Sequence, residues 1–405
     1  MIFNQYISIM NYLIKTVLIM LIILIILLIY MSSEYLYSKY LKYKTEYFAL
    51  KEQLHKGGSL NNFSIANNNL SNKIFDLIST NDSIFSPISI TFALSLLHLS
   101  AHGNTDKQLT ELFGHKYTLD ELNNIYKLFN NEIMKMTNAL IINKKYKVNN
   151  KYLESISNLA LIEQSDFTNI NVIIKKTNDY IEKNTNGLIK NTLKENDINN
   201  MTIMILINTI YFKANWLHEF NIENTYKERF NNTKQVDMMY QQNNFNYYEN
   251  NKLQMIELPY KNEDYVMGII LPKDNKIPII NTSQFNDLVN SLQEEKVQLH
   301  LPKFKHRKNI QLVPILEKLG VTDLFNNKAN LDLAKEAYVS KIIHEAVVIV
   351  DEKGTEAAAV TVIIMKQMMA MPTKKPIIFK ADHEFIYYIR HIPTNMILFY
   401  GNFDG

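Results

Sequence analysis

The sequence predicts an α+β fold with a largely antiparallel sheet, because helical patterns come first along the chain and strand patterns follow. Helices are predicted at residues 74–78, 89–99 and 119–136. Strands are predicted at residues 204–212, 265–271, 297–301, 346–350 and 396–401. Strand and helix do not alternate regularly, which argues against a doubly wound parallel sheet. Ser86 and Pro87 mark the start of the second helix, since serine caps helices and proline fits their first turn.

The composition is that of a globular protein and excludes several kinds of chemistry. Of the 405 residues, 47% are apolar and 20% charged, which rules out wholesale disorder. The net charge of +3 is too small to indicate a nucleic-acid partner. The chain has no cysteine, so it has no disulfide, thiolate zinc site, iron–sulfur cluster or cysteine nucleophile. Any catalysis would therefore use other side chains.

Residues 16–31, TVLIMLIILIILLIYM, form an unbroken apolar run without a charge. The run is slightly shorter than the roughly 20 residues that cross a bilayer comfortably, but longer than most signal-peptide cores. We predict an uncleaved transmembrane or signal-anchor helix that follows a tail of residues 1–15. A cleaved signal peptide, which would make the protein secreted, and a soluble segment are the alternatives. Lysines after the run would place its C-terminal side in the cytosol.

Residues 32–59 are predicted to form a helical stem and linker. Within residues 36–54 the apolar and tyrosine positions recur at alternating steps of four and three, which is a heptad pattern. This segment would either self-associate or lie on lipid headgroups. Gly57, Gly58 and the asparagine-rich stretch to Asn69 indicate a linker. Residues 60–405 contain no further linker or repeat, so we expect them to form one domain.

Motifs for catalysis or cofactor binding are missing from the sequence. It contains no glycine-rich phosphate loop, dinucleotide fingerprint, His-Glu-x-x-His or nucleophile elbow. The ten histidines do not occur at metal-ligand spacing. We therefore expect no metal, no cofactor and no enzymatic activity. The densest basic cluster, residues 303–308, is interpreted as a solvated face, with a polyanion site as the alternative.

Residues 351–372, DEKGTEAAAVTVIIMKQMMAMP, have an unusual composition. A surface loop would contain more Asn, Ser and Gly, and a helix would not change from alanines to β-branched residues. Small residues followed by strand formers suit a segment that slides into a crowded sheet. An apolar edge strand explains the pattern equally well.

Five motifs together resemble those of the serpins, the serine-protease-inhibitor superfamily, in family order across residues 60–405. They are FSPISI at 85–90, NTIYFKANW at 208–216 with Phe220, VSK at 339–341 with HEA at 344–346, EKGTEAAA at 352–359, and FKADHEF at 379–385 with ILFYG at 397–401. The resemblance implies the serpin fold: helices, three β-sheets with a large, mostly antiparallel central one, and an exposed reactive-centre loop.

The resemblance also assigns roles to single residues. A polar cluster beneath the strands that must part, the shutter, would consist of Ser86, Ser89, Asn208 and His344. The breach, where the loop first enters the sheet, would consist of Trp216, Lys303 and Glu352, with the last two forming a charge pair. The hinge of the loop would comprise Glu352, Gly354, Thr355, Glu356, Ala357, Ala358 and Ala359.

The mechanism implied by the resemblance is that of a suicide substrate. A serine protease, or alternatively a cysteine protease, cleaves the loop and is trapped as an acyl-enzyme when the loop inserts into the central sheet. Because side chains alternate along a strand, residues 355, 357, 359, 361 and 363 would share one face. None of them is charged or proline, so we predict an inhibitor.

The scissile bond is predicted between Met368 and Met369 from family spacing, with Ala370 and Met371 as alternatives because the loop is slightly long. Methionine suits elastase-, chymotrypsin- or subtilisin-like pockets, whereas cleavage after Lys366 would suit a trypsin-like pocket.

Two other functions remain open at this point. The chain would be a non-inhibitory, membrane-tethered binding module, or a membrane-anchored hydrolase with an unrecognised triad. The Asn-, Ile-, Lys- and Tyr-rich composition is typical of an AT-rich genome, such as that of a large DNA virus or a protist parasite. For a viral protein, the membrane would be that of the host cell.

Overall fold

A computed structural model of the chain describes residues 58–78, 82–199, 201–355 and 375–405. Residues Ser59–Gly405 form one compact unit. The predicted anchor (16–31), the predicted stem (36–54) and most of the predicted reactive loop lie outside the described residues. Within the described ranges, no helix is both long enough and apolar enough to cross a membrane.

Helices occur mainly in the first half of the described chain. They are α2 (Gly58–Ile78), α3 (Pro87–Leu99), α4 (Gly103–Phe113), α5 (Leu119–Phe129), α6 (Asn150–Ser155), α7 (Ile170–Asn184), α8 (Thr282–Asn290) and α9 (Val313–Lys318). Short 3₁₀ turns are η1 (Glu195–Asp197), η2 (Ile222–Asn224), η3 (Asp323–Phe325) and η4 (Ile392–Thr394). As predicted, Ser86 caps α3 and Pro87 occupies its first turn.

A seven-stranded sheet is the element that positions the candidate site. Its strands, in spatial order, are β3 (Leu161–Ser165), β2 (Met134–Asn143), β4 (Met204–Phe212), β12 (Lys341–Val350), β13 (Gly354–Thr355) and β5 (Ala214–Asn215), and β11 (Phe304–Gln311) also pairs with β12. The pairs β2–β3 and β4–β12 are parallel, and the other pairs are antiparallel.

A second sheet contains nine strands within the described residues. They are β1 (Ser83–Phe85), β16 (Met396–Phe403), β15 (Phe385–His391), β9 (Tyr265–Pro272), β8 (Leu253–Pro259), β7 (Lys234–Glu249), β10 (Gln293–Pro302) and β14 (Ile377–Lys380), with β6 (Tyr226–Phe230) beside β7. The long strand β7 pairs with β10 along most of its length and with β8 at its end. It thereby joins two smaller sheets into one.

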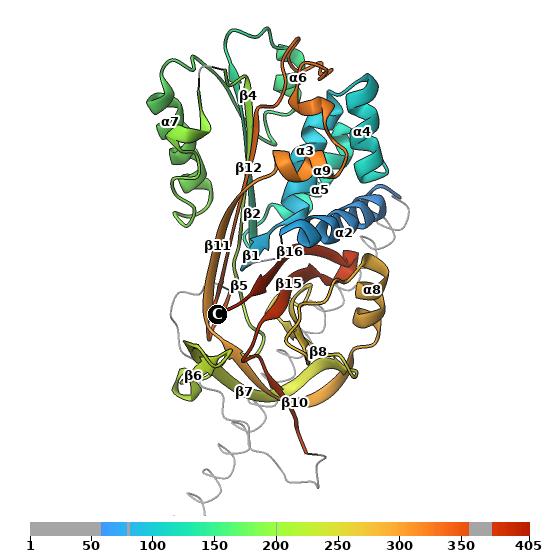
Figure 1. The fold of residues 1–405 in the computed structure, drawn as a ribbon, viewed down its shortest axis with the longest axis vertical. Coiled ribbons are helices and arrows are strands. Elements are labelled where there is room, and N and C mark those ends of the chain that lie inside the picture. Colours follow the sequence, from blue (N-terminus) through green and yellow to red (C-terminus); the bar gives the residue numbers. More distant parts are fainter. Residues whose placement is uncertain (1–57, 79–81, 200, 356–374) are drawn as a thin grey trace, which may run out of the picture. The chain divides into compact units, whose positions relative to one another are not determined.

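Helices cover both faces of the seven-stranded sheet. Figure 1 shows α3 and α5 on one face and α7 on the other, and α3 contacts β4 while α7 contacts β2. Every residue of β4 is buried, as expected for a strand covered on both faces. The smaller of two apolar cores lies between α7, the chain that follows it, and the sheet.

Two predictions of local structure were wrong. The helix predicted over residues 119–136 ends at Phe129, because the Oδ1 atom of Asn131 accepts the backbone N–H groups of Ile133 and Met134 and turns the chain into β2. The linker predicted up to Asn69 is helical from Gly58 onward. Two of its asparagines are buried rather than solvated: the side chain of Asn67 donates to the carbonyl of Ile397, and that of Asn68 donates to the carbonyl of Asn395.

Candidate functional site

A buried polar cluster lies where β4 and β12 pair side by side. We call the paired region of β4 and β12, residues 205–211 with 341–347, the seam. His344 and Asn208 occupy the same register in the seam, and Ser86 and Ser89 lie at the start of α3 beneath it. All four residues are fully buried. The structure thus brings together the residues that the resemblance assigned to a shutter, and we call them the His344 cluster.

Hydrogen bonds connect the members of the His344 cluster and determine the tautomer of the histidine. The backbone N–H of Ser86 donates to Nε2 of His344 over 2.9 Å. Because Nε2 accepts, the proton is on Nδ1, which donates to Oδ1 of Asn208 over 2.7 Å. Burial lowers the pKa of His344 to about 3, so the ring is neutral at physiological pH. A protonated ring would place two donors, Nε2–H and the Ser86 N–H, against each other.

Asn138 belongs to the same network, although sequence reasoning missed it. The side-chain amide of Asn208 donates to Oγ of Ser89 over 2.6 Å and to Oδ1 of Asn138 over 2.8 Å. Asn138 lies on β2 directly opposite Asn208 and is itself buried. In a chain so rich in asparagine, its residue type carried no signal. Only the alignment of β2 with β4 would have identified it.

A second cluster lies at the end of the seam, around the indole of Trp216. The indole stacks on Tyr260 with 4.6 Å between ring centroids, and its Nε1 donates to the carbonyl of Asp351 over 2.9 Å. Lys303 and Glu352 form an ion pair of 2.8 Å. We call these residues the Trp216 cluster.

Glu352 is held in place from two sides. Its side chain is 8% exposed, and its carboxylate accepts from Lys303 and from the hydroxyl of Thr225 over 2.8 Å. Burial raises the pKa of Glu352, but the hydrogen bonds from Lys303 and Thr225 outweigh burial and keep that pKa below its ordinary value. The carboxylate therefore stays ionised and fixes the position of the chain just before β13.

The first residues of the predicted hinge already form part of the sheet. Gly354 and Thr355, which make up β13, lie between β12 and β5 and pair with both. A Cβ atom on Gly354 would lie 2.2 Å from the carbonyl oxygen of Ala214, so only glycine fits there. Thr355 is fully buried and its hydroxyl hydrogen-bonds to that of Tyr260 over 2.7 Å.

The remaining predicted site residues lie outside the described residues. They are Glu356, Ala357, Ala358, Ala359, Lys366, Met368, Met369, Ala370 and Met371. In the described part of the chain, no group of three His, Cys, Asp or Glu side chains is arranged to hold a metal ion.

The basic cluster at residues 303–308 does not form one charged surface. Arg307 pairs with Glu345, and Lys303 pairs with Glu352. His306 points to the other face of β11, where it is buried and bonded to the hydroxyl of Tyr387. Because these side chains lie on both faces of the strand, and Lys303 and Arg307 are paired with carboxylates, the structure favours a structural role over a polyanion site.

Sequence comparison identifies the family. The sequence model described as Serpin (serine protease inhibitor) matches residues 65–404. The chain belongs to the serpin family. It is 48% identical over 396 residues to the uncharacterized serpin-like protein R700 of Acanthamoeba polyphaga mimivirus, a match that covers 91% of this chain and 99% of that protein. It is also 34% identical over 378 residues to the human leukocyte elastase inhibitor, covering 84% of this chain and 99% of the inhibitor.

Solved structures confirm the serpin fold. Native protease nexin-1, crystallised with heparin, is 26% identical, with a TM-score of 0.77 over 86% of this chain and 100% of that one. Uncleaved ovalbumin, at 24% identity, has a TM-score of 0.73 over 84% of this chain and 99% of its own. The predicted α+β class, with a large and mostly antiparallel sheet, is therefore confirmed. As a family, serpins are described as inhibitors of serine proteases and not as catalysts.

Proposed function

We propose that this serpin is a suicide inhibitor that traps a serine protease by inserting its cleaved reactive loop into the seam. The His344 cluster is proposed as the shutter, and the Trp216 cluster as the breach. Glu352, Gly354 and Thr355 are the described part of the proposed hinge.

The observation that carries this proposal is the position of β13. Gly354 and Thr355 are seated between β12 and β5, while β4 and β12 pair directly from Lys341 to Val347. Because β5 follows β4 after one residue, β13 lies in line with the gap that would open if β4 and β12 separated. A cleaved loop could extend β13 along the whole seam and gain backbone hydrogen bonds to both strands.

The chemistry needed from the chain is that of a substrate. The nucleophile of the protease attacks the carbonyl of the scissile bond and forms an ester, while the new amino terminus leaves. Hydrolysis of that ester would release the protease. The loop must therefore insert, and carry the protease with it, before water reaches the ester.

The target is proposed to accept methionine, with the bond between Met368 and Met369 as the bait. A relative at 34% identity is named for inhibiting leukocyte elastase. Elastase-like pockets are apolar and suit an uncharged side chain such as methionine. The domain division (1–15, 16–31, 32–59 and 60–405), attachment to a membrane through residues 16–31 and self-association through 36–54 also stay proposals, which rest on sequence alone.

Incubation with an elastase-like protease tests the proposed function. An inhibitor gives a complex that survives SDS and contains one copy of each protein. Clean cleavage of the loop without a trapped protease would contradict the proposal and favour the non-inhibitory binding module. Active-site-blocked protease is the control, because it can bind the loop but cannot form the ester.

A further inference from the structure

The chain between α7 and β4, residues 185–199, lies over the seam on the face of the sheet opposite α3. We call this segment the strap. Its buried side chains pack against both strands of the seam in one apolar cluster. The members of that cluster are Ile189, Leu193 and Ile198 of the strap, Ile205 and Ile207 of β4, and Ile343 and Val347 of β12.

Polar contacts tie the strap to β11 and β12, across the seam from β2, on which α7 packs. They run from Arg307 to the carbonyl of Lys190, from Asn309 to the carbonyl of Thr192 over 3.2 Å, and from Lys341 to the carboxylate of Asp197 over 2.9 Å. The strap therefore starts on one side of the seam and is fastened on the other.

Arg307 makes the most specialised of these contacts. Its Nε donates to the carboxylate of Glu345, whose side chain is only 2% exposed, while its Nη2 donates to the carbonyl of Lys190. The planar guanidinium can make both bonds at once, whereas a lysine ammonium on a longer, flexible stem cannot do so with the same geometry. Arg307 thus links the strap to a buried charge on β12.

Two buried hydroxyl groups between the strap and the seam lack hydrogen-bond partners in the described part of the chain. The hydroxyls of Thr192, on the strap, and Thr209, opposite Glu345 in the seam, are buried and have no hydrogen-bond partner among the described residues. Such groups favour states in which water reaches them. The apolar cluster and the polar contacts thus hold the strap closed, whereas these two hydroxyls oppose closure.

An inserted strand would separate β4 from β12 by one strand spacing, about 4.8 Å. The strap continues directly into β4, so its fastening to β11 and β12 would have to stretch by a comparable distance. A hydrogen bond of about 3 Å does not survive such an extension. The contacts of Arg307, Asn309 and Lys341 with the strap must therefore break before the seam opens fully.

We propose that Arg307 is a positioning residue that latches the strap over the seam and thereby limits the rate of loop insertion. The proposal rests on the proposed function, because the insertion rate then decides whether a protease is trapped or released after cleavage. A tighter latch turns the chain into a substrate, and a weaker latch makes it a more efficient trap.

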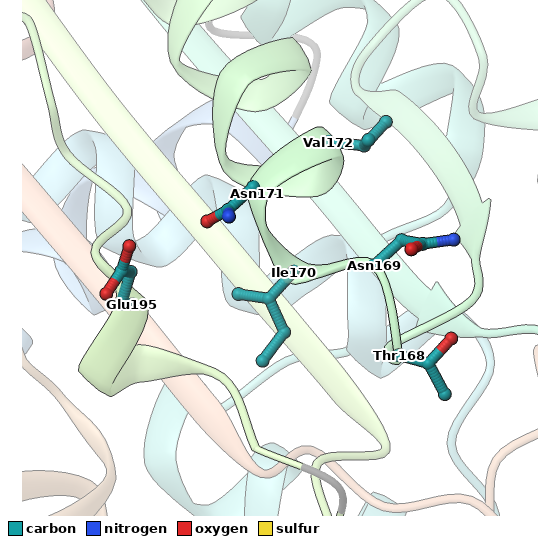
Figure 2. A pocket seen from close by; sticks show the side chains of 6 residues that line it. All are labelled: Thr168, Asn169, Ile170, Asn171, Val172 and Glu195. Atoms are coloured by element: carbon teal, nitrogen blue, oxygen red, sulfur yellow. The ribbon is translucent and has the colours of Figure 1, made fainter.

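Space for the strap to move is present near its η1 turn. A hollow of about 390 Å³ separates the first turn of α7 from Glu195 (Figure 2). Thr168, Asn169, Ile170, Asn171 and Val172 form the helix side of this hollow. Glu195 lies on η1, so this hollow gives the η1 turn room to shift relative to the first turn of α7.

The single tryptophan of the chain provides the test. After the loop is nicked by a protease that is not trapped, insertion should change the fluorescence of Trp216, which lies next to β13 and bonds to Asp351. Arg307→Lys keeps the positive charge beside Glu345 but loses the hydrogen bond from Nη2 to the carbonyl of Lys190. We expect the Trp216 fluorescence to change about tenfold faster in this variant, because insertion no longer has to break one charge-assisted hydrogen bond. Asn309→Ala should act in the same direction.

The matched control is Lys305→Ala. Lys305 lies on the same face of β11, two residues from Arg307, and makes no hydrogen bond or ion pair with the strap in the described part of the chain. Its insertion rate should equal that of the unmodified chain. Equal rates in Arg307→Lys, Asn309→Ala and the unmodified chain would overturn the latch but leave trapping intact. If the unmodified chain shows no insertion after nicking, the proposed function itself fails.

Discussion

Nδ1 of His344 and Oδ1 of Asn208 lie 2.7 Å apart across the seam, so β4 and β12 are joined by a side-chain hydrogen bond as well as by their backbones. Both residues are fully buried, and the other ring nitrogen of His344, Nε2, can accept the backbone N–H of Ser86 only while the imidazole is neutral. Any strand that enters the seam must break it. The stability of the closed sheet is therefore coupled to the protonation of His344.

The first prediction concerns the pH dependence of stability. His344 has a pKa of about 3 in the folded chain and about 6.5 when unfolded, so its contribution is complete above pH 6.5 and is lost as the pH falls toward 3. His344→Gln removes this titration. The stability advantage of the unmodified chain over the variant should therefore shrink by about 1.4 kcal/mol per pH unit below 6.5.

Urea unfolding at pH 7, 6 and 5, followed by far-UV circular dichroism, measures this difference. His98 and His391 also have pKa values lowered by burial, but they are present in both proteins and cancel. A stability difference that stays constant with pH would mean that His344 is not buried as a neutral ring.

The second prediction tests whether Asn138 acts through Asn208. Asn138→Ala removes the acceptor for the Asn208 amide and the donor to the carbonyl of Leu159, which should cost about 1–3 kcal/mol. In an Asn208→Ala background the same change should cost about 1 kcal/mol less, because the shared bond is already gone. Asn143, also buried on β2 but outside the cluster, is the control. Asn143→Ala should cost the same stability in the Asn208→Ala background as in the unmodified chain.

The third prediction concerns the close approach of Gly354 to β5. In Gly354→Ala the new Cβ would meet backbone atoms of Ala214 and Asn215, which cannot move aside as a flexible side chain could. β13 should be expelled, at a cost of about 1–3 kcal/mol in stability, and Trp216 should become more accessible to a fluorescence quencher. Gly58→Ala, where no atom lies within 4 Å, should leave quenching unchanged. Unchanged quenching in both variants would mean that β13 tolerates a side chain.

Much of the fold was accessible from sequence patterns, because apolar strands buried on both faces leave a clear signal. The predicted strand at residues 204–212 matches β4, and the Ser86–Pro87 cap marks the start of α3. Asparagine residues misled the prediction twice, once within a predicted helix and once within a predicted linker. Asn131 ends a predicted helix through its side chain, and Asn67 is buried against Ile397 within what looked like a linker.

The candidate site was predictable only in part, because its contacts join segments far apart in sequence. The motifs located Ser86, Asn208 and His344 but gave no sign of Asn138, which depends on the register of β2. Likewise, the basic run around Arg307 looked like a surface patch. Its partner Glu345 became visible only once β11 and β12 were aligned.

The last prediction identifies the bait residue and rests on the proposed function. Mild peroxide converts exposed methionines to sulfoxides, and a polar sulfoxide fits an apolar protease pocket poorly. If Met368 precedes the scissile bond, oxidation should slow inhibition on the order of tenfold. The Met368→Leu variant should inhibit at the same rate before and after oxidation. Met201 is 80% exposed and also oxidisable, so Met201→Leu is the matched control and should remain sensitive. Inhibition at an unchanged rate after oxidation of the unmodified chain would instead place the bond after Lys366.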